Sequence, residues 1–153
     1  MKIEGKLLIK APIQDVRDFL LDPQKLAPCV PGCENVVTLA DNSYMVTEAV
    51  KIGPISASFN LKVTIVEMTP PRCLFITLEG KDFKTASLIN TKTTINLERI
   101  SDSETQVNYV LDVALSGVLG KFGEGIMRRK AHSLAEKFTE NLRAQLEVRR
   151  GTT

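Results

Sequence analysis

The chain has 153 residues, of which 43% are hydrophobic and 25% are charged, and its formal net charge is +2. A chain of this length forms one domain with a single core, so we predict one domain over residues 1–150. The small net charge and a pI of about 8.4 argue against a nucleic-acid-binding protein. The sequence has neither a signal peptide nor a stretch approaching the roughly 20 apolar residues of a membrane span. We therefore expect a cytoplasmic protein.

The first thirty residues predict one strand and two short helices. Residues 2–10 alternate between apolar and charged side chains, which is typical of a half-buried strand. Ala11-Pro12 ends this strand, and apolar residues then recur at helical spacing over 13–20. Asp22-Pro23 has the form of a helix cap followed by a first-turn proline, which predicts a second short helix ending at Leu26.

From Glu34 onward the apolar residues again alternate, and five turn signals divide the segment into six predicted strands. Residues 56–65 and 107–115 alternate most regularly, which indicates an antiparallel sheet with one covered face and one wet face. In the segment 85–99 the parity stays open, because its apolar and threonine side chains suit either face. The turn signals are Asp41-Asn42, Gly53-Pro54, Pro70-Pro71, Gly80 to Lys84 and Ser101 to Ser103.

The segment from Lys121 to Arg149 predicts one long amphipathic helix, because its apolar residues recur every three or four positions. The predicted fold is therefore α+β: a curved, seven-stranded antiparallel sheet grips the C-terminal helix, and the two short helices close one end. We expect an apolar cavity between helix and sheet, where lipophilic ligands bind. The apolar stripe consists of Met127, Ala131, Leu134, Phe138, Leu142 and Leu146.

The run from Leu21 to Glu34, LDPQKLAPCVPGCE, resembles the hallmark stretch of the CoxG family, the G-subunit family of carbon monoxide dehydrogenase. That family is a branch of the START-like (SRPBCC) helix-grip superfamily. Gly53-Pro54, the Thr69-Pro70-Pro71 turn and the segment from Gly117 to Gly120 are also similar to the family. The resemblance implies a helix-grip fold with an apolar cavity, and an accessory role beside molybdenum hydroxylases of the carbon monoxide dehydrogenase type.

Three cysteines and a single histidine are the candidates for soft-metal ligands. Cys29 and Cys33 flank a Val-Pro-Gly turn, whereas Cys73 and His132 are distant from them in sequence, so we predict no metal site. An odd number of cysteines does not form a disulfide framework, and we expect reduced thiols. His132 follows a run of basic residues, which suits a surface position better than a catalytic one.

Glu48 interrupts an otherwise apolar strand face formed by Tyr44, Val46, Val50 and Ile52. A carboxylate facing the cavity would orient a ligand or act as a base with a raised pKa. The opposite face of this strand is only weakly polar, so the sequence leaves open which face is buried.

Three features near the ends of the expected cavity suggest gating or surface contacts. Phe83 lies among lysines in a loop and is a candidate for gating a pocket or touching a partner. The glycines at 120, 123 and 125 weaken the start of the last helix, which predicts a mobile lid over 121–127. The basic runs at 128–130 and 149–150 suit either a solvated helix face or peripheral contact with the cytoplasmic face of a membrane.

The leading hypothesis is a non-enzymatic protein that holds a hydrophobic small molecule, such as a quinone or a lipid, and serves a molybdenum hydroxylase subunit. No other cofactor is expected. One alternative is an enzyme of the cyclase or hydratase kind in which Glu48 or a tyrosine transfers protons, and another is a pure docking module. The predicted ligand-binding residues are Leu26, Pro31, Gly32, Tyr44, Glu48, Phe59, Leu61, Phe75, Phe83, Tyr109, Phe122, Met127 and Leu134.

Overall fold

The computed structural model describes residues 1–70 and 72–151, the side chains of 148–151 excepted. Pro71 of the predicted turn and the side chains of Arg149 and Arg150 therefore lie outside the described residues. The strands are β1 (Lys2–Ile9), β2 (Cys33–Ala40), β3 (Ser43–Ile52), β4 (Ile55–Thr69), β5 (Cys73–Asp82), β6 (Ser87–Ser101) and β7 (Glu104–Ser116). The helices are α1 (Ile13–Leu20), α2 (Pro23–Leu26), η1 (Ala27–Cys29), η2 (Leu119–Phe122) and α3 (Glu124–Gly151).

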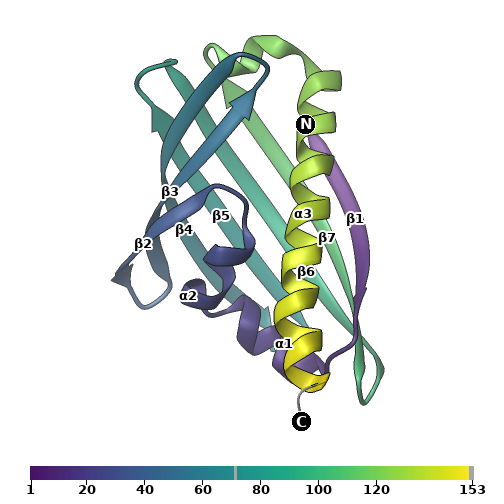
Figure 1. Ribbon diagram of the computed structural model, residues 1–153. Helices are drawn as coiled ribbons and strands as arrows, with labels where there is room; N and C mark the ends of the chain where they lie inside the picture. Colours follow the sequence, from purple (N-terminus) through teal and green to yellow (C-terminus); the bar gives the residue numbers. More distant parts are fainter. Residues whose placement is uncertain (71, 152–153) are drawn as a thin grey trace.

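The strands form one seven-stranded sheet in the order β1-β7-β6-β5-β4-β3-β2, and every neighbouring pair is antiparallel. The long helix α3 lies across one face of this sheet, while α1 and α2 lie at the end where α3 finishes (Figure 1). This arrangement confirms the predicted α+β helix-grip fold, including its element order.

The local chemistry of the short helices follows the sequence signals. The Asp22 side chain accepts a hydrogen bond of 3.0 Å from the backbone N–H of Gln24, and Pro23 occupies the first helical position of α2. Helix α1 is held to the sheet by Arg17, which donates two hydrogen bonds of 2.7 Å to the carboxylate of Glu67 on β4. These contacts fix the short helices at one end of the sheet.

The last helix begins at Glu124, three residues later than predicted. Residues Leu119–Phe122 instead form the short helix η2, and Gly123 interrupts the chain with a φ of 87°. That backbone conformation is accessible to glycine and strained for other residues, so α3 starts after it. Leu119, which precedes the predicted mobile lid over 121–127, is fully buried, whereas most residues of the lid itself are exposed.

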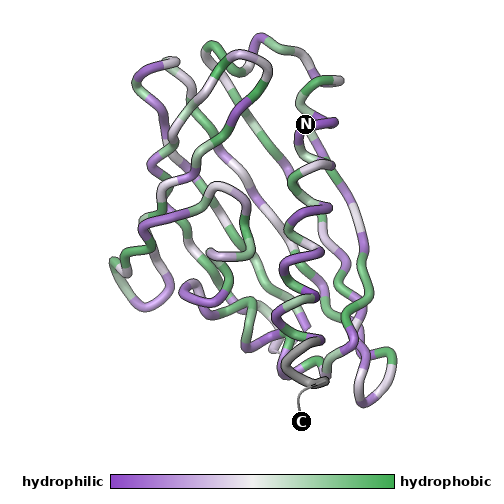
Figure 2. Tube along the Cα trace, viewed as in Figure 1, coloured by the Kyte–Doolittle hydropathy of each residue, from purple (hydrophilic) through white to green (hydrophobic). Residues whose placement is uncertain are grey.

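Along most strands buried and exposed residues alternate, and Figure 2 shows the corresponding alternation of hydrophobic and hydrophilic residues along the chain. We call the face that carries α3 the inner face. The register of β6 with β7 pairs Ile95 with Tyr109 and Leu97 with Val107, and three of these four side chains are buried. The odd-numbered residues of β6 from 89 to 97 therefore share the inner face, which resolves the parity that the sequence left open.

The buried core is divided into two clusters. The first lies where α1, η1 and the last turns of α3 meet the sheet, and it contains Leu20, Leu74 and Leu142. The second lies at the far end of β3 and β4, beneath η2, and it contains Phe59 and Leu119. No helix in the described part of the chain is long and apolar enough to cross a membrane.

Candidate ligand-binding site

Helix α3 is attached to the sheet mainly along one edge. The Arg143 guanidinium donates to the carbonyl oxygen of Leu8, and the backbone N–H of Lys10 donates to Glu147 at 3.0 Å. The Asn141 side-chain amide donates to the carbonyl oxygen of Cys29 in η1, also at 3.0 Å. The backbone of α3 accordingly comes closest to β1 and η1, while Leu142 and Leu146 pack in one cluster with Leu74 and other residues of the central strands.

The two halves of α3 differ in how well their apolar stripe is covered. Leu142 and Leu146 are 1% and 5% exposed, whereas Met127, Ala131 and Leu134 are only half-buried although they continue the same stripe. The inner-face residues of the central strands behave in the same way. Val63, Leu78, Ile89, Leu111 and Val113 are all half-buried. Solvent therefore reaches apolar side chains on both layers, and Val63, Leu78, Ile89 and Met127 among them pack against the second core cluster.

Glu48 lies on the inner face beside this region. Its β3 register pairs it with Phe59 on β4, which is 2% exposed, and with Cys33 on β2. Burial raises the pKa of the Glu48 carboxyl from 4.5 to about 7. Burial, followed by the charges of Glu48 and Glu34, raises the pKa of the Cys33 thiol to about 11. Near neutral pH this pair therefore combines a thiol that stays protonated with a carboxyl that is easily protonated.

The Pro31-Gly32 turn positions Cys33 opposite Glu48. Gly32 has a φ of 80°, and its carbonyl oxygen accepts a hydrogen bond of 2.9 Å from the backbone N–H of Ala49. A Cβ at residue 32 would overlap the Ala49 carbonyl oxygen. The turn can therefore approach β3 this closely only with glycine, which explains why the predicted motif needs one.

The tyrosines of the predicted site lie on the inner face at different places. The Tyr44 hydroxyl already donates to the carbonyl oxygen of Asp41 at 3.3 Å, so it is engaged at the β2–β3 turn. Tyr109 packs beside the first core cluster, and its ring occupies the space that a Cβ of Gly5 would need. Leu26 of α2 packs against the same cluster. Tyr109 and Leu26 therefore lie together at the end of the inner face near α1, whereas Tyr44 lies apart from them.

Other predicted residues belong to the second cluster. Phe59 and Leu61 are buried in it, and Phe122 and Met127 pack against it from η2 and α3. Leu134 lies farther along α3, between the two clusters. Phe59, Leu61, Phe122 and Met127 thus gather at the end of the inner face opposite α1.

Phe75 and Phe83 lie elsewhere, and their assignment to the inner site is wrong. Phe75 pairs with Val66 and Thr94 on the outer face, because Leu74 and Ile76 take the inner positions of β5. Phe83 is 77% exposed in the β5–β6 hairpin, where the Lys81 ammonium lies 4.6 Å from its ring centroid. The strand from Cys73 to Leu78 is apolar at most positions, so the sequence did not reveal its parity.

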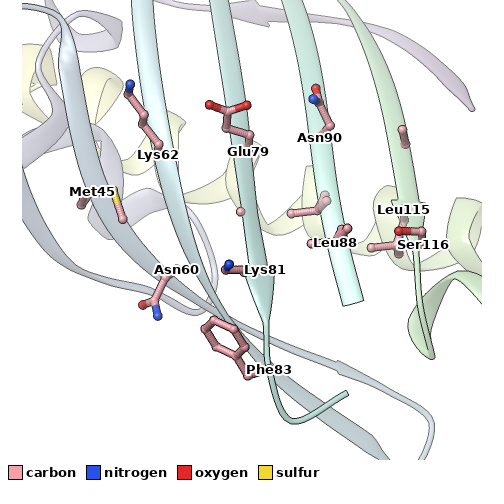
Figure 3. Close-up of a pocket in the computed structure, with 13 residues that line it drawn as sticks. Met45, Asn60, Lys62, Glu79, Lys81, Phe83, Leu88, Asn90, Leu115 and Ser116 are labelled. Carbon is pink, nitrogen blue, oxygen red and sulfur yellow. The ribbon is translucent and has the colours of Figure 1, made fainter. Parts of the chain in front are cut away.

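Phe83 lines an open hollow of about 700 Å³ on the outer face of the sheet (Figure 3). The hollow carries the charged side chains of Lys62, Glu79 and Lys81 together with the apolar side chains of Leu88 and Met45. Because outer-face side chains form its wall, this hollow is separated from the region around Glu48 by the sheet itself.

A buried polar cluster beneath the β5–β6 hairpin was not recognised from the sequence. Asp82 accepts hydrogen bonds from the Thr85 hydroxyl at 2.7 Å and the Thr85 backbone N–H at 2.9 Å. These bonds lower the pKa of Asp82. The Ser87 hydroxyl accepts a bond of 3.1 Å from the backbone N–H of Leu119, which ties η2 to the hairpin. Short-range polar residues in a loop give no sequence signal that distinguishes such a cluster from solvated turn residues.

The residues needed for metal binding do not come together. Within residues 1–70 and 72–151, no three histidine, cysteine, aspartate or glutamate side chains form a group able to hold an ion. Cys29 is buried, Cys33 and Cys73 are half-buried, and His132 is exposed on α3. The polar groups of the inner face that the pairing of β2 with β3 brings together are Glu48 and Cys33.

A curved antiparallel sheet that grips one long helix, with short helices after its first strand, is the START-like (helix-grip) fold. The model of the CoxG family, the carbon monoxide dehydrogenase G-subunit family, matches residues 5–147. The chain therefore belongs to that family.

Solved structures of similar fold come from several bacteria. A conserved protein from Geobacillus kaustophilus has a TM-score of 0.88 at 19% identity, covering 96% of this chain and 95% of that one. A START superfamily protein from Mycobacterium smegmatis has a TM-score of 0.67 at 16% identity, covering 95% and 97%. The Zhui aromatase/cyclase from Streptomyces sp. R1128 has a TM-score of 0.66 at 16% identity, covering 97% and 94%. No curated protein matches the chain significantly. At these identities the structural likeness concerns the fold alone.

Proposed function

We propose that the protein binds a lipophilic molecule, such as a quinone or a lipid, between α3 and the inner face of the sheet. The observation that carries this proposal is the incomplete burial of apolar side chains on the facing sides of the helix and the sheet. Met127, Ala131 and Leu134 on the helix, and Leu78 and Leu111 on the sheet, all keep solvent-accessible surface. An apolar ligand would remove that surface from water.

The energy available from such burial is sufficient for binding. Removing about 300 Å² of apolar surface from water contributes roughly 7 kcal/mol, at about 25 cal/mol per Å². The cost of immobilising the ligand reduces this figure. Micromolar binding corresponds to about 8 kcal/mol, so a ligand that also covers the facing protein surface reaches this range.

Membership of the CoxG family supports a second part of the proposal, namely that the protein serves a redox enzyme of the molybdenum hydroxylase type. A binding protein of this kind would hold a lipophilic molecule for the enzyme rather than transform it. The partner would be a subunit of that enzyme, and the ligand would travel in the region between α3 and the sheet.

Fluorescence titration with the neutral probe N-phenylnaphthylamine tests the ligand-binding proposal. Ala131 is half-buried, so in the variant Ala131→Trp the indole would occupy the proposed ligand position between helix and sheet, whereas Ala144→Trp places the same side chain on the exposed face of the same helix. We expect Ala131→Trp to weaken probe binding about tenfold or more, because the indole takes up the volume that the probe would occupy. Ala144→Trp should bind as the wild type does. Equal affinity in all three proteins, or no probe binding at all, would refute the proposal.

A further inference from the structure

Glu48 is the one acidic residue that the strand β3 carries on the inner face. The other inner-face residues of β3 are Tyr44, Val46, Val50 and Ile52, and Glu48 is directly opposite the buried ring of Phe59. The next inner-face residues of β4 on either side, Ala57 and Leu61, are buried as well. A charged carboxylate would therefore be surrounded mostly by apolar side chains.

No cation in the described part of the chain forms an ion pair with Glu48. The ion pairs of helix α3, which covers this face, join Arg128 to Glu124 and Lys137 to Glu140. Arg128 also donates to the carbonyl oxygen of Lys2. Arg129 and Lys130 make no ion pair with Glu48 within 4 Å, and Lys121 of η2 is exposed. The titratable group facing Glu48 from β2 is the Cys33 thiol, which is uncharged at neutral pH.

The balance of these contacts favours the neutral carboxylic acid. Burial without a positive partner raises the pKa of Glu48 to about 7, so the acid form is well populated at neutral pH. A neutral carboxylic acid has one O–H donor in addition to its acceptor oxygens. Among the described residues, none forms a hydrogen bond with the Glu48 carboxyl. A bound ligand or water would have to supply the acceptor.

Building on the proposed function, we propose that Glu48 donates a hydrogen bond to an uncharged carbonyl or hydroxyl oxygen of the lipophilic ligand. The site therefore selects neutral oxygen-bearing molecules over pure hydrocarbons and over carboxylates or phosphates. A hydrocarbon leaves the acid O–H without a partner. An anionic head group would be desolvated beside Glu48 without a cation to neutralise it.

Three probes that share one ring skeleton separate these cases: α-tetralone with a neutral carbonyl, tetralin without oxygen, and tetralincarboxylate with a negative charge. Their affinities are measured by displacement of N-phenylnaphthylamine at pH 6, where Glu48 is mostly protonated. The readout is the ratio of the tetralin Kd to the tetralone Kd, which cancels differences in probe hydrophobicity when variants are compared. The variants are Glu48→Leu, which removes the donor, and Glu48→Gln, which keeps a donor of similar shape. Glu79→Gln on the outer face is the matched control.

We expect the ratio to be about five to ten times larger in the wild type than in Glu48→Leu, which is the size of one hydrogen bond. Glu48→Gln and Glu79→Gln should keep the wild-type ratio. In the wild type the ratio should fall at pH 9, where the carboxylate has lost its proton. Tetralincarboxylate should be the weakest of the three ligands for the wild type.

Two results would overturn the inference while leaving the proposed function intact. One is displacement by all probes with the same ratio in Glu48→Leu as in the wild type, and the other is tightest binding of tetralincarboxylate. Failure of N-phenylnaphthylamine to bind the wild type would instead overturn the proposed function, and this inference with it.

Discussion

Gly32 offers a direct test of how the turn before β2 positions the candidate site. Its backbone has a φ of 80°, and its carbonyl oxygen accepts the 2.9 Å bond from the backbone N–H of Ala49, the neighbour of Glu48. In Gly32→Ala the positive φ costs about 1–2 kcal/mol. The overlap of the new methyl group with the Ala49 carbonyl oxygen adds about 1–3 kcal/mol, as overpacking does in cores.

The expected loss of unfolding free energy for Gly32→Ala is therefore about 2–5 kcal/mol, measured by urea denaturation followed by far-UV circular dichroism. Gly53→Ala is the matched control, because Gly53 also has a positive φ, 58°, but a Cβ there would meet nothing within 4 Å. The control should lose only the backbone contribution of about 1–2 kcal/mol. Equal losses in the two variants would refute the close approach of the turn to β3.

Two further predictions concern a carboxyl group whose pKa is raised by burial and a buried hydrogen bond. Because the pKa of Glu48 is raised from 4.5 to about 7, the folded state retains a proton that the unfolded state releases, and the unfolding free energy falls as pH rises through that interval. The unfolding free energy of Glu48→Gln relative to that of the wild type should therefore rise by about 1–2 kcal/mol between pH 4.5 and pH 8, an amount already reduced for solvent screening. Urea denaturation at several pH values measures this difference, and a difference that stays constant with pH would contradict the prediction. Ser87→Ala should lose about 1–3 kcal/mol, because the buried backbone N–H of Leu119 is left without its 3.1 Å acceptor. Differential scanning calorimetry measures that loss, and Ser103→Ala in an exposed turn is the control. An unchanged melting temperature of Ser87→Ala would show that the hairpin and η2 are not coupled.

The type and order of the elements were predictable because periodicity is a local property. Alternation over residues 56–65 and 107–115 and the helical stripe from Met127 to Leu146 each report which side of an element is covered, without reference to the rest of the chain. The resemblance of the run from Leu21 to Glu34 pointed to the family that the match over residues 5–147 then showed. These features need only the spacing of side chains along one segment.

Sequence-based prediction is least accurate where both faces of a strand are apolar. The sequence pattern predicts Phe75 on the inner face, but Leu74 and Ile76 hold the inner positions of β5. Only the pairing of β5 with β4 and β6 decides which face Phe75 takes. It also predicts Phe83 at the mouth of the cavity, although the hairpin directs this ring to the hollow on the outer face. In both cases the missing information is the register with strands distant in sequence.

The sequence by itself determined the architecture of this protein: a helix-grip fold with seven strands, two short helices and a long helix with one apolar stripe. Only the tertiary structure decided that Glu48 faces inward opposite Cys33 and Phe59, and that the Met127–Leu134 part of α3 remains half-buried. The physical reason is that a pKa and an exposed apolar surface depend on which groups come close in space. The pairing of β2, β3 and β4 brings residues 33, 48 and 59 together, and packing of α3 on the sheet adds Met127 to the cluster that contains Phe59.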